Sequence, residues 1–401
     1  MIPYGRQDIT QSDIDAVLKV LRSDFVTQGP AVPIFERSVL ARVHARHAVA
    51  MNSATSALHV ACMGLGLRPG DRLWTVPNTF VASANCGRYC GADVDFVDID
   101  PHTWNLNVRA LADKLIRARR AGRLPQILVP VHFGGQPTEQ EAIWELSQEF
   151  GFKVLEDASH SLGATRNGEA VGSCRWSHVT VLSFHPVKII TSGEGGMALT
   201  NDEVLALRMA ELRSHGITRD PSRFRGGELA AENAATLRER PPSWYYEQQA
   251  LGFNYRITDI HAALGTSQLE RLDIYVERRN ALAARYDAAL SGLALQLPHI
   301  SAGNRSAFHL YIVRLKPGHV RSHRHLFDAL RASGIAVNLH YMPVHLHPYY
   351  RELGFAPGQF PEAEAHGREA ITLPLFPALT EAMQDQVVEA LRRELKNFGA
   401  S

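Results

Sequence analysis

The stretch VTVLSFHPVKIITSGEGG, residues 179–196, combines a predicted buried strand, a lysine and a glycine-rich turn. Val179–Phe184 is an apolar run of strand length, and Thr191–Gly196 forms a tight turn that leads into a further strand. Lys188 lies between them. Its amine either projects into solvent, as most lysines do, or is held in a crevice, where burial lowers its pKa and makes it a nucleophile.

The residues before this stretch repeat the same order of strand and helix. Strands that alternate with helices predict an α/β fold, in which a parallel or mostly parallel sheet is covered on both faces. The predicted strands are 47–51, 72–77, 94–97, 127–131, 152–155 and 179–184, and the predicted helices are 55–67, 81–89 and 140–150.

The pattern changes in the second half of the chain. Arg219–Tyr246 contains paired glycines and paired prolines and predicts a long surface loop, which in a compact domain is usually functional or mobile. We expect a large domain at 1–255 and a smaller α/β domain at 256–401. The predicted elements of the smaller domain are helices within 259–290 and 323–333, a strand at 307–315 and extended chain at 336–341.

The overall composition excludes several classes of partner. The 401 residues carry 42 basic and 41 acidic side chains, a formal net charge of +1. This balance gives no electrostatic reason to expect nucleic acid or an anionic membrane as partner. The four cysteines form no C-x-x-C pair, and the sequence shows neither a signal segment nor an apolar run of membrane-spanning length. We therefore expect a cytoplasmic protein.

Two motifs next to predicted strands suggest binding of an anion and of a cation. Asn52–Ala57 joins a strand to a helix, and its small residues suit either a phosphate at the helix N-terminus or a plain N-cap. Asp157 follows the strand 152–155, where a carboxylate points into the ligand crevice of an open sheet. It either pairs with a cationic ring nitrogen or caps the next turn. His160 either stacks on a ligand or packs as a polar residue.

The remaining candidate motifs are weaker. Asn254 and Arg256 precede a predicted helix and either bind anionic groups or serve as a turn residue and a surface charge. His340, His345 and His347 lie close together in sequence, but no H-E-x-x-H or carboxylate pattern accompanies them. We predict no metal site.

Taken together, these motifs resemble the DegT/DnrJ/EryC1/StrS family of sugar aminotransferases over nearly the whole chain. The resemblance implies the fold type I architecture of pyridoxal-phosphate (PLP) enzymes: a large domain with a mostly parallel seven-stranded sheet and a smaller C-terminal α/β domain. It also implies PLP as cofactor and a homodimer whose active sites are shared between subunits. The matching segments are TQG at 27–29, NSAT at 52–55, EDASH at 156–160, SFHPVK at 183–188 and GFNYR at 252–256.

The resemblance implies a role for each matching residue. Lys188 would hold the cofactor as a Schiff base, and Asp157 would pair with its pyridine nitrogen. The other cofactor-binding residues would be Ala54, Thr55 and Ser183 at the phosphate with Asn254 of the second subunit, Phe80 over the ring, and His160, where many relatives carry glutamine. The substrate-binding residues would be Tyr4, Asp24, Phe25, Val26, Thr27, Ala54, Asn254, Asn338, Leu339, His340 and Tyr341.

Within the family, the chain most resembles the enzyme of the pseudaminic acid pathway, through residues 214–220, 244–249 and 340–350. This implies transfer of the amino group of L-glutamate to C4 of a UDP-linked 4-keto-6-deoxy-2-acetamido sugar. The alternative is another nucleotide-sugar C4 or C3 aminotransferase, of the perosamine or 4-amino-arabinose type. Lysine rather than histidine at position 188 favours amino transfer over dehydration.

Two other classes of function fit the sequence less well. A nicotinamide-dependent oxidoreductase needs a G-x-G-x-x-G turn after its first strand, whereas Gly64–Gly70 has the wrong spacing and follows a predicted helix. A non-catalytic sensor or scaffold related to the family has no need of Lys188, Asp157 and Ser183 together. The sequence therefore predicts an enzyme.

Overall fold

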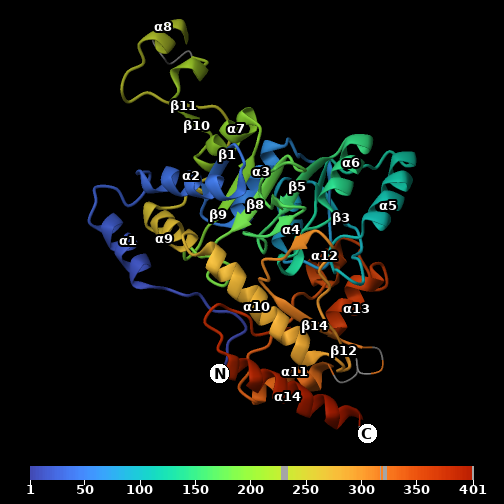
Figure 1. Cartoon of the computed structure of the whole chain (residues 1–401). Helices are drawn as coiled ribbons and strands as arrows, with labels where there is room; N and C mark the ends of the chain where they lie inside the picture. The colour runs from blue at the N-terminus through green and yellow to red at the C-terminus, as the bar shows by residue number, and fades with distance from the viewer. Residues whose placement is uncertain (227–233, 317, 319–322, 400–401) are drawn as a thin grey trace.

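A seven-stranded sheet forms the centre of the large part of the chain (Figure 1). The computed structural model describes residues 1–226, 234–316, 318 and 323–399. The strand order is β1-β9-β8-β5-β4-β2-β3, and β9 runs antiparallel to both of its neighbours while the other pairs are parallel. The strands are β1 (His47–Met51), β2 (Arg72–Thr75), β3 (Asp93–Phe96), β4 (Ile127–Val129), β5 (Lys153–Asp157), β8 (Val179–Ser183) and β9 (Gly196–Thr200). The predicted fold class is confirmed.

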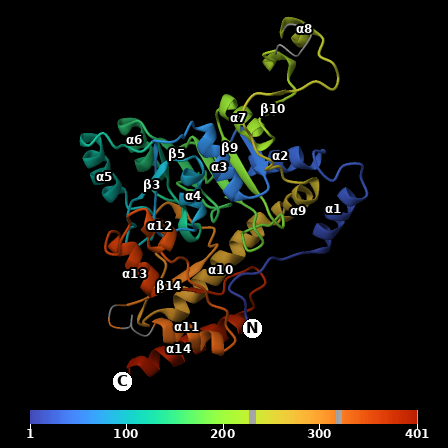
Figure 2. The same cartoon turned by 180° about the vertical axis from the view of Figure 1, so that it is seen from behind.

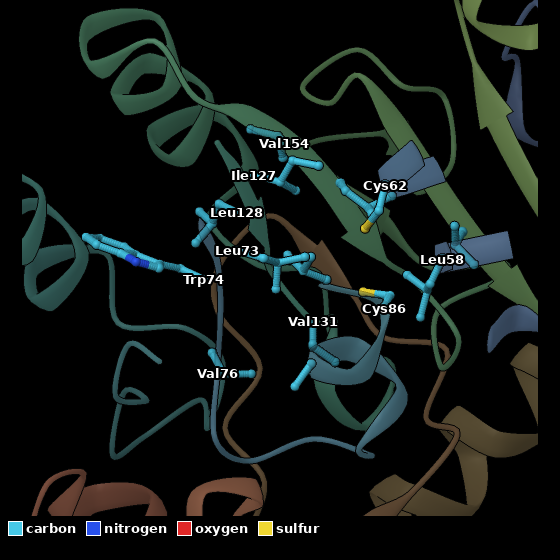
Figure 3. Close-up of a cluster of buried hydrophobic side chains, with 14 of the residues drawn as sticks. Leu58, Cys62, Leu73, Trp74, Val76, Cys86, Ile127, Leu128, Val131 and Val154 are labelled. Atoms are coloured by element: carbon cyan, nitrogen blue, oxygen red, sulfur yellow. The ribbon is translucent and has the colours of Figure 1, made fainter. Parts of the chain in front are cut away.

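Helices cover both faces of this sheet because successive side chains of each strand point to opposite sides. Figure 3 shows Leu58 and Cys62 of α3 and Cys86 of α4 gathered around Leu73 of β2, whereas Trp74 points away from this cluster. Full burial of an aliphatic side chain such as Leu73 contributes about 1.5–3 kcal/mol. The helices next to these strands are α3 (Ala54–Gly64), α4 (Ala82–Tyr89), α5 (Val108–Arg120), α6 (Gln140–Phe150) and α7 (Glu203–Arg213).

The N-terminal helices pack against a helix that follows them by more than two hundred residues. Asp13 is fully buried, and its carboxylate accepts hydrogen bonds from Ser267 at 2.7 Å and from Gln268 at 2.8 Å. The helical stretch predicted within 259–290 is divided into two helices at Glu270. The helices concerned are α1 (Gln11–Leu21), α2 (Ala31–Val43), α9 (Asp259–Leu269) and α10 (Leu272–Leu290).

A smaller three-stranded antiparallel sheet organises the C-terminal part. Its core joins Tyr286 of α10 and Leu326 of α11 to Leu391 of α14, and Ile2 from the N-terminus packs into the same cluster. The domain boundary at residue 256 stays a prediction. The elements are β12 (Leu295–Gln296), β14 (Tyr311–Leu315), β15 (Ala370–Leu373), α11 (His323–Ala332), α12 (Pro348–Glu352), α13 (Pro361–Glu369) and α14 (Glu381–Gly399), and a further small sheet is β13 (Asn304–Arg305), β6 (Thr165–Arg166) and β7 (Glu169–Ala170).

The segment predicted as a surface loop, Arg219–Tyr246, projects from the body of the chain (Figures 1 and 2). It begins after β10 (Ile217–Thr218) and ends at β11 (Glu247–Gln248), which pair with each other. It also contains α8 (Ala234–Glu239), which the sequence pattern did not predict. Phe224 and Leu237 are buried in this segment, and the Phe224 ring lies 5.0 Å from that of Tyr245. Residues 227–233 lie outside the described part of the chain. In the described part, no helix is both long and apolar enough to cross a membrane.

Candidate active site

A cavity of about 420 Å³ lies at the carboxyl ends of β5 and β8, the edge where an open α/β sheet binds its ligands. Residues of the smaller part of the chain form its opposite wall. Twelve of the predicted site residues line this cavity: Tyr4, Ala54, Thr55, Phe80, Asp157, His160, Ser183, Lys188, Asn338, Leu339, His340 and Tyr341.

The N-terminus of α3 lies directly on the sheet because residue 196 is a glycine. A Cβ atom at Gly196 would lie 2.3 Å from the backbone nitrogen of Ala54. The Ser53 hydroxyl accepts a hydrogen bond from the N–H of Ser56 at 3.1 Å, which confirms the N-cap interpretation of this motif. Ala54 and Thr55 line the cavity, and the first N–H groups of a helix have no partners within the helix. This end of the cavity therefore suits an anion such as a phosphate.

Asp157 ends β5 and is 5% exposed. Its Oδ2 atom accepts a hydrogen bond from the Ser83 hydroxyl at 2.7 Å, and its Oδ1 atom accepts from the Ser159 backbone N–H at 3.1 Å and hydroxyl at 2.6 Å. The adjacent Glu156 points to the other face of the sheet, where the Thr180 hydroxyl donates to it at 2.7 Å. Asp157 therefore both caps the following turn and presents a negative charge to the cavity.

The amine of Lys188 lies in the cavity rather than in open solvent. Its Nζ atom is 3.5 Å from Nε2 of His309. Burial lowers the pKa of Lys188 to about 8, although the charge of Asp157 opposes this shift. At neutral pH roughly a tenth of such a group is the neutral amine, far more than for a solvated lysine. The arrangement supplies a nucleophile beside a carboxylate and an anion site, which are the three groups that a PLP molecule requires.

Histidines and a tyrosine surround this amine without adding positive charge. Burial, and then the charge of Lys188, hold the pKa of His160 and His309 well below the usual value, and lower that of His340 to about 3. The rings of His160 and His309 are 4.5 Å apart, and Nε2 of His160 lies 3.3 Å from the Tyr341 hydroxyl. At neutral pH these imidazoles are uncharged, so they offer hydrogen bonds rather than ionic attraction.

Five predicted residues lie outside this cavity within the single chain. Asp24–Thr27 form an exposed turn between α1 and α2, where Thr27 pairs with Thr258. Asn254 pairs with Ser214. Of the histidines that suggested a metal, His340 lines the cavity and His345 lies 3.1 Å from Glu364. Across the described residues, no group of three or more His, Cys, Asp or Glu side chains is arranged to hold a metal ion.

Two important residues were missed in the sequence. His309 lies just before β14, and a lone histidine at the start of a strand carries no recognisable pattern. Ser83 lies in α4, and its bond to Asp157 joins residues 74 positions apart. Neither position has a local signal that distinguishes it from an ordinary buried polar residue.

Comparison with known proteins agrees with this geometry. A model of the DegT/DnrJ/EryC1/StrS aminotransferase family matches residues 7–392. The spore coat polysaccharide biosynthesis protein SpsC of Bacillus subtilis (strain 168) is 36% identical over 401 residues, which cover 98% of this chain and 97% of SpsC.

Solved structures show the same fold over the whole chain. Helicobacter pylori PseC, an aminotransferase involved in the biosynthesis of pseudoaminic acid, has a TM-score of 0.88 at 27% identity, with 99% of both chains covered. The PLP-form of Spr1654 from Streptococcus pneumoniae has a TM-score of 0.86 at 27% identity, also with 99% of both chains covered. The protein therefore belongs to the DegT/DnrJ/EryC1/StrS aminotransferase family and is a sugar aminotransferase that depends on PLP.

Proposed function

We propose that the protein transfers the amino group of L-glutamate to C4 of a UDP-linked 4-keto-6-deoxy-2-acetamido sugar, in the biosynthesis of pseudaminic acid. The main evidence for amino transfer is the buried amine of Lys188, which lies in one cavity with the Asp157 carboxylate and the N-terminus of α3. The choice of sugar is supported by the resemblance of residues 214–220, 244–249 and 340–350 and by the structural likeness to PseC.

The cavity offers one group for each polar end of the cofactor. PLP, when bound, supplies the electron sink of the reaction. Asp157 would hold a proton at its pyridine nitrogen, because a nearby negative charge favours the protonated ring. The phosphate of the cofactor would be bound by Ser183, at the end of β8, and by Ala54 and Thr55, which form the N-terminus of α3. Lys188 would be the covalent anchor.

Two side chains would contact the ring of the cofactor. Phe80 lines the cavity although it is 58% exposed, and its ring lies 6.3 Å from that of Tyr341. An aromatic side chain this exposed in a single chain is suited to stacking on a planar ligand. His160, whose Nε2 atom lies 3.3 Å from the Tyr341 hydroxyl, would help to orient the ring.

Lys188 would also move protons once it is free of the cofactor. As an amine it would carry the proton between the α-carbon of glutamate and the C4′ atom of the cofactor, acting as base and then as acid. A pKa of about 8 suits both tasks because it lies near the working pH. Since the same cavity serves glutamate and then the keto sugar, we expect ping-pong kinetics.

The sugar nucleotide would be bound by residues of two subunits. Tyr4, Leu339, His340 and the amide of Asn338 line the cavity of their own chain, with Tyr341 beside them. The remaining predicted substrate residues are exposed or lie elsewhere in the single chain, and we propose that they act across a homodimer: Asp24, Phe25, Val26, Thr27 and Asn254.

Exposed apolar side chains support the homodimer. Leu18 and Leu21 of α1 and Phe25 in the next turn are exposed by 38%, 52% and 53%. Neighbouring apolar side chains on a surface commonly mark an interface with another chain.

The projecting segment Arg219–Tyr246 also exposes an aromatic side chain, Trp244. We propose that this segment closes over bound substrate. A variant that lacks the segment but keeps the sugar affinity and turnover of the wild type would show this proposal to be wrong.

A coupled assay tests the substrate directly. Purified protein is incubated with L-glutamate and a panel of 4-keto nucleotide sugars, and the products are identified by mass and NMR. We expect one aminated UDP-2-acetamido sugar, with the new amino group at C4. The variant Lys188→Ala, which should keep the fold by circular dichroism, should lose transamination by several orders of magnitude. Normal turnover by this variant would reject the role of the lysine.

A second candidate is another nucleotide-sugar C4 or C3 aminotransferase. It is favoured by the 36% identity to SpsC, a protein of spore coat polysaccharide biosynthesis. The same panel of sugars separates the two candidates. If the protein aminates a perosamine-type or 4-amino-arabinose-type precursor and leaves the UDP-2-acetamido sugar unchanged, the second candidate is established.

A further inference from the structure

His309 reaches the amine of Lys188 from the opposite wall of the cavity. Its Nε2 atom lies 3.5 Å from Nζ, and its side chain is 4% exposed. We propose that His309 is a positioning residue that holds the free amine of Lys188 by accepting a hydrogen bond from it, and that Arg279 fixes His309 for this task. The inference rests on the proposed role of Lys188 as anchor and proton carrier.

A buried arginine holds the backbone on which His309 lies. Arg279 is 1% exposed, and its guanidinium donates to the carbonyl oxygens of Phe308 at 3.2 Å, His309 at 3.3 Å and Leu375 at 2.9 Å. Arg279 forms no ion pair with a carboxylate among the residues that the structure describes. Burial lowers its pKa to about 10, so it stays protonated at neutral pH. A buried cation of this kind is costly, and its three carbonyl acceptors tie the chain at Phe308 and His309 to the distant Leu375.

The same backbone is confined from its other side by a glycine. Phe308 has a φ of 44°, a left-handed conformation that is unfavourable for a bulky residue. A Cβ atom at Gly135 would lie 2.7 Å from the Phe308 nitrogen and 2.9 Å from the His309 nitrogen. The N–H of Ala307 donates to the Gly135 carbonyl at 3.0 Å. The backbone at residue 309 is therefore held both by Arg279 and by the close approach of Gly135, as expected for a side chain that must point at one target, the amine of Lys188.

The charges around the amine place the proton on Lys188 rather than on His309. Burial, the charge of Lys188 and that of Arg279 all lower the pKa of His309. The other titratable groups that face the lysine are the Asp157 carboxylate, which raises the pKa of the amine, and three histidines on neighbouring elements: His160, His185 and His340. A neutral imidazole has one nitrogen free to accept. Nε2 of His309 can therefore receive a hydrogen bond from the charged or the neutral amine.

The experiment measures the ionisation of Lys188 itself. Cofactor-free protein is labelled with acetic anhydride across a pH series, and acylation of the Lys188 peptide is quantified by mass spectrometry. The wild-type midpoint is expected at about 8. His309→Leu should lower this midpoint by about one unit, because the charged amine loses an acceptor while Asp157 remains. His309→Gln, which keeps an acceptor at a similar distance, should restore it.

A matched control and a second variant keep the test decisive. His178→Leu removes a histidine outside the cavity, whose Nδ1 accepts from the Val154 N–H, and should leave the midpoint unchanged. If His309→Leu does not fold, His309→Asn should still lower the midpoint because its amide is too short to reach the amine. In holoenzyme, His309→Leu should lower kcat with little change in KM for L-glutamate.

An unchanged labelling midpoint in folded His309→Leu or His309→Asn protein would overturn the inference, whatever happens to kcat, because a merely structural role does not alter the ionisation of the amine. The outcome is independent of the sugar. A shifted midpoint in a protein that aminates no member of the sugar panel would uphold the positioning role and reject the proposed substrate.

Discussion

Replacement of Asp157 by asparagine tests the electrostatic part of the site. The substitution keeps the size of the side chain and removes its charge. In the structure the carboxylate accepts from Ser83 at 2.7 Å and from Ser159 at 2.6 Å, so one of these donors would face the new amide NH₂ group. The change also removes the charge that raises the pKa of Lys188, so that this pKa falls below about 8.

The size of the effect follows from the bond that is lost. A hydrogen bond to an ionised partner contributes about 1.5–3 kcal/mol. If Asp157 holds a proton at the pyridine nitrogen, this energy stabilises the transition state, and each 1.36 kcal/mol corresponds to about tenfold in rate. We therefore expect Asp157→Asn to slow the half-reaction with L-glutamate by about 10- to 150-fold. Binding of the nucleotide sugar should change far less.

Two measurements separate these effects. The half-reaction with L-glutamate is followed by stopped-flow absorbance of the cofactor in a single turnover, and affinity for the UDP sugar is measured by calorimetry. Asp113→Asn on the exposed surface of α5 serves as the control, since it removes one carboxylate far from the cavity. A half-reaction at the wild-type rate, together with weakened sugar binding, would refute the pairing of Asp157 with the cofactor.

Three further perturbations test neighbouring features. Ser83→Ala should cost about 1 kcal/mol of stability in thermal denaturation and slow the half-reaction less than Asp157→Asn does; a wild-type Tm would speak against the bond. Gly196→Ala should cost about 1–3 kcal/mol and weaken binding of PLP in titrations, whereas Gly5→Ala, whose Cβ meets its nearest neighbour at 3.7 Å, should do neither. The pKa of Lys188 is about 8 in the folded protein, against 10.5 for an unperturbed lysine such as that of the unfolded chain. The unfolded chain therefore binds more protons between these values, so the stability of cofactor-free protein should rise with pH across this window, by at most about 3 kcal/mol. Chemical denaturation should show this rise in wild type and not in Lys188→Met; equal pH dependence would exclude a shifted lysine.

Much of the fold was predictable because its signals are local. The alternation of apolar runs with helical stretches indicated a mostly parallel sheet, and α6 has the predicted bounds, Gln140–Phe150. Other boundaries shifted by a few residues, and the strand predicted at 152–155 extends as β5 through Asp157. The helix α8 was not predicted, since it forms in a segment of weak periodicity.

Part of the candidate site was predictable for a related reason. Motifs that directly follow neighbouring parallel strands meet at one edge of a sheet, which applies to Asp157 and Ser183 at the ends of β5 and β8. The family resemblance added Ala54 and Thr55, which follow β1 beyond β9, and the structure brings all four residues into one cavity. The sequence leaves open whether Lys188 is solvated. Its burial depends on a wall built by residues more than a hundred positions away.

The order of residues alone thus accounts for most of the strands of the large sheet, its mostly parallel character and the chemistry at the carboxyl ends of its strands, because these follow from periodicity and from what comes directly after each strand. The antiparallel direction of β9 is seen only in the structure. Long-range packing accounts for the rest. The contact of His309 with Lys188, the hold of Arg279 on the His309 backbone and the bond from Ser83 to Asp157 each join distant segments. Such contacts depend on how the two parts of the chain fit together in three dimensions, and no spacing along the sequence encodes them.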